Sequence, residues 1–411
     1  MAYRWIVTWL ADRTQGSLGS RASALIPGAW NPSGSQWGTR PAWLDAASGP
    51  TPSDIRDVDV LVIGAGQAGL SAAHELHRAG MRGFADGTAI SGVYQVLDAE
   101  VRPGGAWQHR WPTLTMSTIN DIADLPGLKV GEHDKDDLAA HVIPDYFTSY
   151  EETFDFPILR PVLVHEVHRS EGRYLVHTTG GTWRARAIIN CTGTWTRPFI
   201  PYYPGQSAFA GLQLHTQDYR GPVQFQRRRV AVVGGGISAT QHLAEIAPYA
   251  KSTAWFTRRE PVWVDTGGGL KGGREVEESV RARVEKGLRP LSVVAATGLL
   301  VTDLVRGARE AGVFKRRPMF TRIEPEGPMQ ENGKLWRADV ILWATGFRSE
   351  LRHLSALKLR TKEGGIMMRG TAVADEPTLH LIGYGPTAST IGARWGARKA
   401  VRQLRGILGI N

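Results

Sequence analysis

Residues 58–69 read Val-Asp-Val-Leu-Val-Ile-Gly-Ala-Gly-Gln-Ala-Gly, and this stretch decides the fold. The apolar run 58–63 predicts a buried strand, and the stretch 70–79 that follows the glycines predicts a helix. A Gly-x-Gly-x-x-Gly sequence between a strand and a helix indicates a dinucleotide-binding turn, in which the helix N-terminus faces the phosphates. The residues predicted to form this first nucleotide site are Gly64, Ala65, Gly66, Gln67, Ala68 and Gly69.

A second fingerprint, Gly-Gly-Gly-Ile-Ser-Ala at 234–239, follows the apolar run 230–233 and precedes another helix-like stretch. Its predicted nucleotide-binding residues are Gly234, Gly235, Gly236, Ser238 and Ala239. The first glycine of such a motif permits a tight turn, and the second lets the backbone approach a pyrophosphate. Two such motifs predict an α/β protein with two Rossmann-type dinucleotide-binding domains.

A third motif lies between the two fingerprints and consists of Phe209, Gly211, His215 and Tyr219 in the spacing FxGxxxHxxxY. The ordered trio resembles the flavin-containing monooxygenases, in the wider group that includes the Baeyer–Villiger monooxygenases. The resemblance covers roughly residues 57–408. It implies FAD at the first fingerprint and NADPH at the second. Baeyer–Villiger enzymes usually carry Trp-Pro or Trp-Asp at the end of this motif, so Tyr219 favours the branch that oxidises heteroatoms.

The resemblance also implies the reaction. A flavin-dependent monooxygenase uses NADPH and dioxygen, forms a C4a-hydroperoxyflavin and transfers one oxygen atom to the amine nitrogen or sulfide sulfur of a small organic substrate. Two alternatives stay open: Baeyer–Villiger oxidation of ketones, which usually needs a nearby arginine, and a flavin- and NADPH-binding redox sensor or uncoupled NADPH oxidase. None of these reactions requires a side-chain nucleophile, because the cofactor supplies the chemistry.

Composition restricts the class of protein further. The 411 residues are 42% hydrophobic and 21% charged, as in an ordinary soluble domain, and no apolar run is long enough to span a membrane. The net charge of +10 is scattered along the chain, which favours anionic cofactors over nucleic acid. Cys191 is the single cysteine, so a dithiol disulfide reductase is excluded and a reducing cytoplasm is expected. The histidines form no metal-binding motif, and no metal is expected.

Four segments are expected along the chain: a poorly ordered extension at 1–52, an FAD domain at 53–200, an NADPH domain at 201–335 and a second part of the FAD domain at 336–411. The FAD domain is thus discontinuous. Strand-like runs at 161–164, 173–177 and 182–189 predict a small antiparallel β-meander inserted in it. The apolar run 338–343 predicts a buried strand that returns to the FAD domain.

Several residues outside the fingerprint are predicted to contact FAD. Asp98 ends the predicted strand 93–97, where an acid typically accepts hydrogen bonds from ribose hydroxyls, although a capping or surface role is the alternative. The glycine pair before Trp107 resembles the family's GGxW segment beside FAD, against an ordinary glycine turn with a buried tryptophan. The further residues expected at FAD are Gly105, Ala106, Trp107, Thr192, Gly193 and Gly385.

Arg258 and Arg259 follow the predicted second strand of the second nucleotide fold. An NAD site would place an acid there to hold the ribose 2′-hydroxyl, whereas guanidinium groups suit the 2′-phosphate of NADPH. The alternative is that both arginines are simply solvated at the surface.

Two residues are catalytic candidates. His215 could act as an acid or base, but a histidine in the linker between nucleotide folds is better suited to orienting the backbone and coupling the domains. Asn120 follows the GGxW region, in a stretch where related enzymes often have a polar residue near the flavin; a loop-capping role is the alternative.

Overall fold

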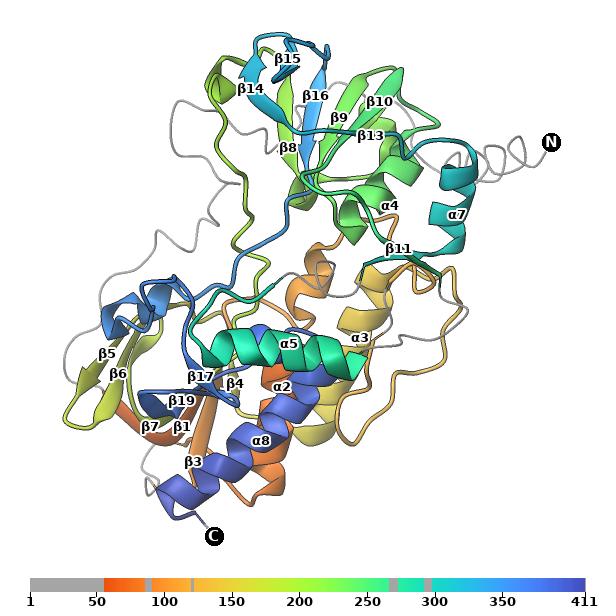
Figure 1. The fold of residues 1–411 in the computed structure, drawn as a ribbon. Coiled ribbons are helices and arrows are strands. Elements are labelled where there is room, and N and C mark those ends of the chain that lie inside the picture. Colours follow the sequence, from red (N-terminus) through yellow and green to blue (C-terminus); the bar gives the residue numbers. More distant parts are fainter. Residues whose placement is uncertain (1–54, 86–90, 120–121, 266–272, 292–297, 411) are drawn as a thin grey trace. The chain divides into compact units, whose positions relative to one another are not determined.

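The computed structural model describes residues 55–85, 91–119, 122–265, 273–291 and 298–410, which form two compact units (Figure 1). The first unit comprises the described residues of 42–199, 262–302 and 346–411. The second unit comprises residues 200–261 and 303–345. The expected extension at 1–52 lies outside the described residues.

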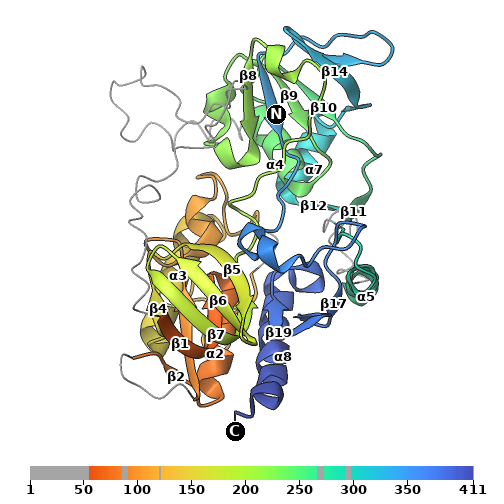
Figure 2. The same ribbon diagram turned by 90° about the vertical axis from the view of Figure 1, so that its left-hand side faces the viewer.

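The first unit is built on a mixed sheet whose centre is parallel (Figure 2). The strands, in the order in which they lie across the sheet, are β17 (Met368–Arg369), β18 (Ala372–Val373), β19 (Glu376–Leu381), β7 (Gly181–Asn190), β1 (Ile55–Ile63), β3 (Val93–Leu97) and β2 (Arg82–Gly83). Strand β4 (Ile158–Leu159) pairs with β3, and β5 (Val164–Ser170) and β6 (Arg173–Thr178) extend β7 as an antiparallel meander. The carboxyl ends of β1, β3, β7 and β19 therefore meet at one edge.

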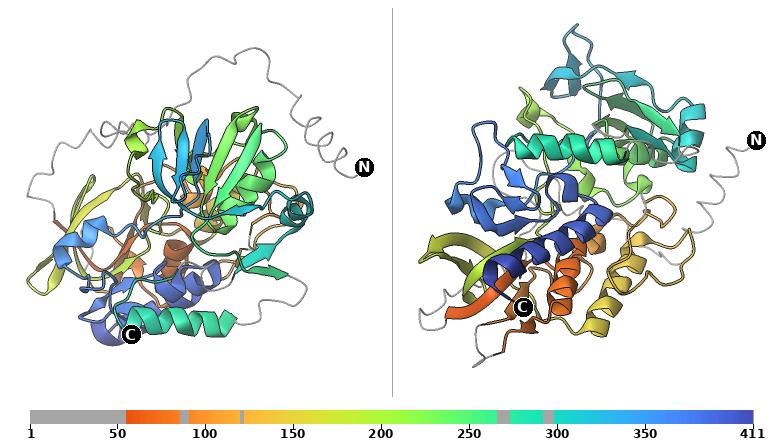
Figure 3. Two further views of the ribbon diagram at one scale, coloured as in Figure 1. Left: turned by 45° about the horizontal axis from the view of Figure 1, so that its top comes forward. Right: turned by 60° about the horizontal axis from the view of Figure 1, so that its bottom comes forward.

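Helices α2 (Gln67–Arg78) and α8 (Thr390–Leu408) pack against each other and against β7 of this sheet (Figure 3). Helix α8 begins at the N-cap Ser389, whose hydroxyl accepts a hydrogen bond from the Gly392 N–H, and ends at Gly409 in the left-handed conformation. The unit also contains α3 (Ala139–Phe154), α5 (Gly273–Glu285), the strand pair β11 (Trp263–Asp265) and β12 (Leu299–Val301), and the 3₁₀ helices η2 (Gly105–His109), η7 (Arg352–Leu357) and η8 (Gly385–Thr387).

The second unit contains a parallel sheet of five strands. Their spatial order is β13 (Arg316–Arg317), β10 (Ser252–Phe256), β9 (Arg229–Val233), β16 (Val340–Trp343) and β8 (Leu212–His215). Helices α4 (Ile237–Ile246) and α7 (Asp303–Glu310) pack together, with α4 against β9 and β10. The remaining elements are the hairpin β14 (Phe320–Glu324) and β15 (Gly327–Gln330) and the 3₁₀ helices η3 (Gln206–Ala208), η4 (Thr216–Asp218) and η5 (Pro222–Phe225).

Both units have an apolar core on their sheets. In the first, Trp183 of β7 packs among fully buried residues of β1, β5 and β6. In the second, Trp343 of β16 packs with Phe256 and Phe320. None of the helices in the described part of the chain is long and apolar enough to cross a membrane.

The α/β architecture with two parallel sheets and an antiparallel meander agrees with the sequence-based prediction. One predicted strand was assigned to the wrong sheet. The run 338–343 forms β16, which pairs with β8 and β9 of the second unit and does not return to the first. A buried-type apolar run carries no information about which sheet it joins, since both sheets offer apolar neighbours.

The two observed units also differ from the expected borders. Residues 262–302, expected in the NADPH domain, belong to the first unit, and residues 336–345 belong to the second. The first unit is thus made of three chain segments rather than two. The physical reason is that α5, in the segment 262–302, packs against η8 and β17 of the first unit. These contacts join residues more than seventy positions apart in the sequence, so the local sequence does not reveal them.

Candidate functional site

The first fingerprint brings backbone groups unusually close together. Gly64 has a φ of +97°, and a Cβ atom there would lie 2.7 Å from the Cys191 carbonyl oxygen at the end of β7. A Cβ on Gly69 would lie 1.8 Å from the Gly64 carbonyl oxygen, so only glycine allows α2 to start this close to β1. Gly66 is the N-cap of α2 and provides no side-chain cap, which leaves N–H groups directed outward at the carboxyl edge of the sheet.

These observations fit a dinucleotide. The Gln67 side-chain amide donates to the Ala123 carbonyl, but its oxygen is buried without a hydrogen-bond partner among the described residues. A hydroxyl or N–H group of a bound molecule would satisfy it. The uncapped helix N-terminus suits an anionic phosphate.

Asp98 lies where the sequence placed it, directly after β3, and is 6% exposed. Its carboxylate accepts a hydrogen bond from the Nε of Arg160 at 2.7 Å. Burial raises the pKa of Asp98, while Arg160 and the backbone N–H of Ala65 in the fingerprint act in the opposite direction. A carboxylate offers about four lone-pair sites, so the bond to Arg160 leaves room for ribose hydroxyls.

The glycine pair before Trp107 contacts the fingerprint directly. A Cβ on Gly105 would lie 2.9 Å from the Gly66 Cα, so the two glycine turns press on each other. Ala106 and Trp107 are half-buried in η2, which begins at Gly105. This segment therefore lies beside the first fingerprint, and its contact with FAD stays a prediction.

Arg110, which sequence reasoning missed, follows η2 and is held between two indole rings. Its guanidinium carbon lies 5.3 Å from the Trp107 ring centre and 4.7 Å from that of Trp195. Burial lowers the pKa of Arg110 to about 10, and its Nε has no hydrogen-bond partner among the described residues. A desolvated cation stacked on aromatic rings suits an anionic group. The signal in the sequence that could have indicated this site is an arginine close to two tryptophans, Trp107 and Trp111.

The other residues predicted at FAD lie on loops at the same edge of the first unit. The Thr192 hydroxyl accepts a hydrogen bond from the Asn190 amide and donates one to the Glu350 carbonyl at 2.5 Å. No described atom would lie within 4 Å of a Cβ on Gly193. Gly385 begins η8 with a φ of +61°. Asn120 lies outside the described residues.

The second fingerprint has the same strand, glycine turn and uncapped helix as the first, but there is more space around its third glycine. Gly234 has a φ of +140°, and a Cβ there would lie 2.1 Å from the Ala344 carbonyl oxygen at the end of β16. Gly236 is the uncapped N-cap of α4, and a Cβ on it would meet no described atom within 4 Å. Gly235, Ser238 and Ala239 complete the turn and the first turn of α4.

Arg258 and Arg259 are exposed just beyond the carboxyl end of β10, next to the strand that leads into the second fingerprint. Among the described residues neither guanidinium has a carboxylate partner. The neighbouring Glu260 pairs instead with Arg316, whose Nη1 lies 2.5 Å from its carboxylate. Arg316 also donates from Nε to the Thr257 hydroxyl, which fixes the start of this loop. Sequence reasoning did not assign Arg316 a role.

The linker motif packs onto the helix that starts at the second fingerprint. His215 is 2% exposed and is the N-cap of η4: its Nδ1 accepts from the Gln217 N–H at 3.2 Å, and its own N–H donates to Asp218 at 2.8 Å. The Tyr219 hydroxyl donates to Glu245 of α4 at 2.6 Å.

The Tyr219 ring also lies 4.1 Å from that of His242 of α4. Burial, together with His215, lowers the pKa of His242 to about 3, so this ring is neutral. Phe209 belongs to the core of the second unit, and a Cβ on Gly211 would lie 2.5 Å from the Asp339 carbonyl oxygen. Of the four motif residues, Tyr219 thus contacts α4 directly, and His215 caps η4.

With the geometry established, three comparisons place the chain among known proteins. Residues 61–379 match the model of the pyridine nucleotide-disulphide oxidoreductase family. The solved structure of a flavin-containing monooxygenase from Stenotrophomonas maltophilia is 34% identical, with a TM-score of 0.72, and the match covers 86% of this chain and 99% of that one. FAD and NADPH are the typical cofactors of such enzymes.

Two curated relatives are more distant. An uncharacterized oxidoreductase CzcO-like from Geobacillus kaustophilus is 30% identical over 195 residues, 46% of this chain and 51% of that protein. A Baeyer-Villiger monooxygenase from Streptomyces coelicolor is 28% identical over 215 residues, 50% of this chain and 39% of that protein. The chain thus spans about half of the first relative and about two fifths of the second.

The two fingerprints predict different responses to the same substitution. Gly69→Ala forces a Cβ against backbone and should destabilise the protein by about 1–3 kcal/mol, as overpacking does. Gly236→Ala adds a methyl group where no described atom lies, so it should leave stability unchanged but weaken NADPH binding at least tenfold. Urea unfolding and titration with NADP⁺ measure both effects. Equal stability losses in the two variants would contradict this account.

The cap formed by His215 predicts a rescue. His215→Ala should cost about 1 kcal/mol of unfolding free energy, and His215→Asn, which can also cap, should recover most of it. Both variants should keep the pH profile of the wild-type reaction. If His215 transfers a proton instead, the Asn variant will be stable but will lose one limb of that profile.

Proposed function

Because the chain belongs to the flavin-containing monooxygenases, within the pyridine nucleotide-disulphide oxidoreductase family, we propose that it is an FAD- and NADPH-dependent monooxygenase acting on a small organic nucleophile. In this proposal NADPH-reduced FAD takes up dioxygen, supplies a C4a-hydroperoxyflavin and transfers one oxygen atom to an amine nitrogen or sulfide sulfur. Cytoplasmic NADPH would be the electron source.

The observation that carries the proposal is the repeated construction of two uncapped helix N-termini, each at the carboxyl edge of its own parallel sheet. At α2 the turn is joined to the buried acid Asp98, which suits the ribose of FAD. At α4 the turn is followed by Arg258 and Arg259, whose guanidiniums have no carboxylate partner among the described residues and suit the 2′-phosphate of NADPH. The first unit would then be the FAD domain and the second the NADPH domain.

The protein's own residues would position the cofactors and exclude water. The single cysteine agrees with a reaction that uses no thiol. Cys191 is buried, burial raises its pKa, and it is the only thiol in the chain. A dithiol mechanism is therefore impossible despite the name of the wider family.

A second candidate, Baeyer–Villiger oxidation of ketones, is favoured by one observation. That reaction needs a negatively charged oxygen to be stabilised. Arg110, just after the GGxW segment, is a desolvated cation that has no carboxylate partner in the described part of the chain. Tyr219 at the end of the linker motif favours heteroatom oxidation instead. A redox sensor or uncoupled NADPH oxidase is the third candidate.

Product analysis tests the proposal. Purified protein loaded with FAD is given NADPH, air and panels of amines, sulfides and ketones, while NADPH loss, peroxide and oxygenated product are measured together. We expect substrate-dependent NADPH consumption with oxygenated sulfide or amine in near-equal amount. Peroxide equal to the NADPH consumed with every substrate would favour the oxidase or sensor.

Arg110→Met separates the first two candidates. If the enzyme oxidises ketones, this variant should lose that activity by about 10²-fold, because a charge-stabilising donor has been removed. Sulfide oxidation needs no stabilised anion and should fall by less than about threefold. Equal loss of both activities would mean that Arg110 serves cofactor binding or structure instead.

The two unpaired arginines predict coenzyme preference. Arg258→Ala and Arg259→Ala should each raise the KM for NADPH by about tenfold and leave the KM for NADH nearly unchanged, since only NADPH carries the 2′-phosphate. Arg227→Ala is the matched control: this arginine is also exposed but precedes β9, at the opposite edge of the same sheet. A rise in both KM values would contradict recognition of the 2′-phosphate.

A further inference from the structure

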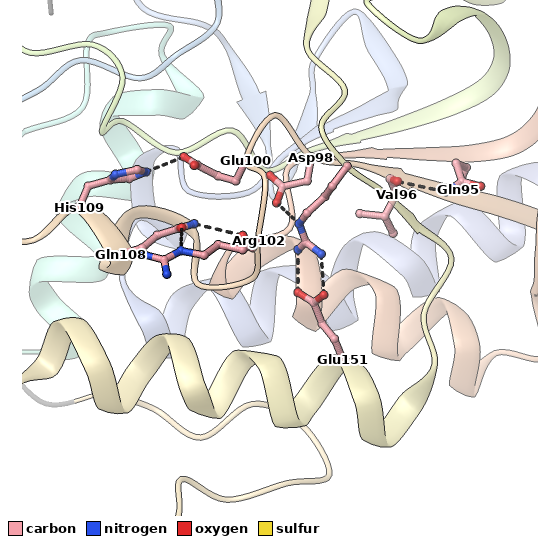
Figure 4. Close-up of polar contacts among 9 residues, drawn as sticks. Gln95, Val96, Asp98, Glu100, Arg102, Gln108, His109 and Glu151 are labelled. Carbon is pink, nitrogen blue, oxygen red and sulfur yellow. Dashed lines mark hydrogen bonds and ion pairs between the residues drawn. The ribbon is translucent and has the colours of Figure 1, made fainter. Parts of the chain in front are cut away.

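A network of three charged side chains lies behind the fingerprint acid, at the carboxyl end of β3. The guanidinium of Arg160 donates from Nε to Asp98 at 2.7 Å, and from Nη1 and Nη2 to the two carboxylate oxygens of Glu151 at 2.6 and 2.7 Å. Figure 4 shows Asp98 and Glu151 directed toward this guanidinium from two sides. All of its side-chain donors except one N–H on each Nη are thereby used by carboxylates.

The three residues come from three separate elements. Asp98 follows β3, Glu151 is on α3, and Arg160 follows β4. The backbone is fixed in the same place, because the Asp98 N–H donates to the Leu159 carbonyl at 3.0 Å and the Asp98 carbonyl accepts from the Val162 N–H at 2.7 Å. The side chains of Asp98, Glu151 and Arg160 are 8%, 13% and 12% exposed, so water contributes little to their solvation.

We infer that Arg160 is a positioning residue that keeps the Asp98 carboxylate ionised and directed at the nucleotide. The inference rests on the proposed binding of FAD at the first fingerprint. Asp98 must accept hydrogen bonds from ribose hydroxyls, and only its ionised form offers acceptors on both oxygens. A buried carboxylate without a cation would take up a proton instead.

The charges around Asp98 determine the expected pH dependence. Burial raises the pKa of Asp98, Arg160 and the Ala65 N–H lower it, and Glu100 raises it further. Burial also raises the pKa of Glu151, and the charge of Asp98 adds to this, whereas Arg160 acts in the opposite direction. Glu100 is itself paired with His109 at 2.8 Å. Removing Arg160 leaves two buried carboxylates without their cation, so the pKa of Asp98 must rise. FAD should then bind more weakly as the pH falls.

The experiment measures FAD dissociation constants by flavin fluorescence for cofactor-free protein at about pH 6 and about pH 8.5. Arg160→Met should weaken FAD binding about tenfold or more at the lower pH and recover a large part of this at the higher pH. Asp98→Asn should be as weak as Arg160→Met at the lower pH but independent of pH. Arg160→Lys, which keeps the charge, should lie between Arg160→Met and the wild type.

Two control variants separate positioning from simple structural support. Arg184→Met removes a guanidinium that pairs with Asp57 through two bonds of 2.6 and 2.7 Å, near the opposite end of β1, and should leave FAD affinity unchanged at both pH values. Glu151→Gln cuts the ionic link to α3 but keeps Arg160 on Asp98, and should change affinity by less than about threefold.

The outcomes distinguish this inference from the proposed function. If the wild type binds FAD and Arg160→Met binds it equally well, or loses the same factor at both pH values, Arg160 is not a positioning residue. Should Arg160→Met fail to fold, an Arg160→Lys variant without any pH-dependent loss, together with a pH-dependent Asp98→Asn, would overturn the inference. Wild-type protein that binds no FAD would overturn the proposed function, and this inference with it.

Discussion

The approach of Gly69 to the Gly64 carbonyl, where no side chain fits, is the constraint on which the first site depends. It places the start of α2 against the end of β1, so that helix N–H groups without a side-chain cap reach the carboxyl edge of the sheet. The same turn holds β7, through the Cys191 carbonyl beside Gly64, and receives Gly105 from the next loop. The nucleotide site is thus built by backbone contacts, and side chains such as Asp98 complete it.

The charged side chains of the two candidate sites differ in sign, in burial and in whether they are paired. At the first, the buried acid Asp98 is paired with Arg160, which Glu151 holds from its other side; in our inference this cation keeps the carboxylate ionised. At the second, Arg258 and Arg259 are exposed and have no carboxylate partner among the described residues, so their charge is available to a ligand. An acid suits a ribose and free guanidiniums suit a phosphate, which is why we assign FAD and NADPH in this order.

The sequence was sufficient wherever local chemistry determines structure. The strand before Gly64, the strand ending at Asp98 and the meander follow from apolar periodicity and glycine turns. The sequence was not sufficient to predict which distant strands pair. The apolar run 338–343 could be buried equally well in either sheet, and it joins the sheet of the second unit. Arg160 was also missed, since nothing in its local sequence shows that a guanidinium there will reach acids on two other elements.

The proposed function depends on a flavin that reacts with oxygen while shielded from water. The measurement that tests this most directly is stopped-flow spectroscopy of FAD-loaded protein, reduced anaerobically with NADPH and then mixed with oxygenated buffer. Our account predicts an absorbing intermediate between reduced and oxidised flavin that persists without substrate and decays faster when a sulfide or amine is added. Direct return to oxidised flavin with stoichiometric peroxide, whatever the substrate, would contradict it.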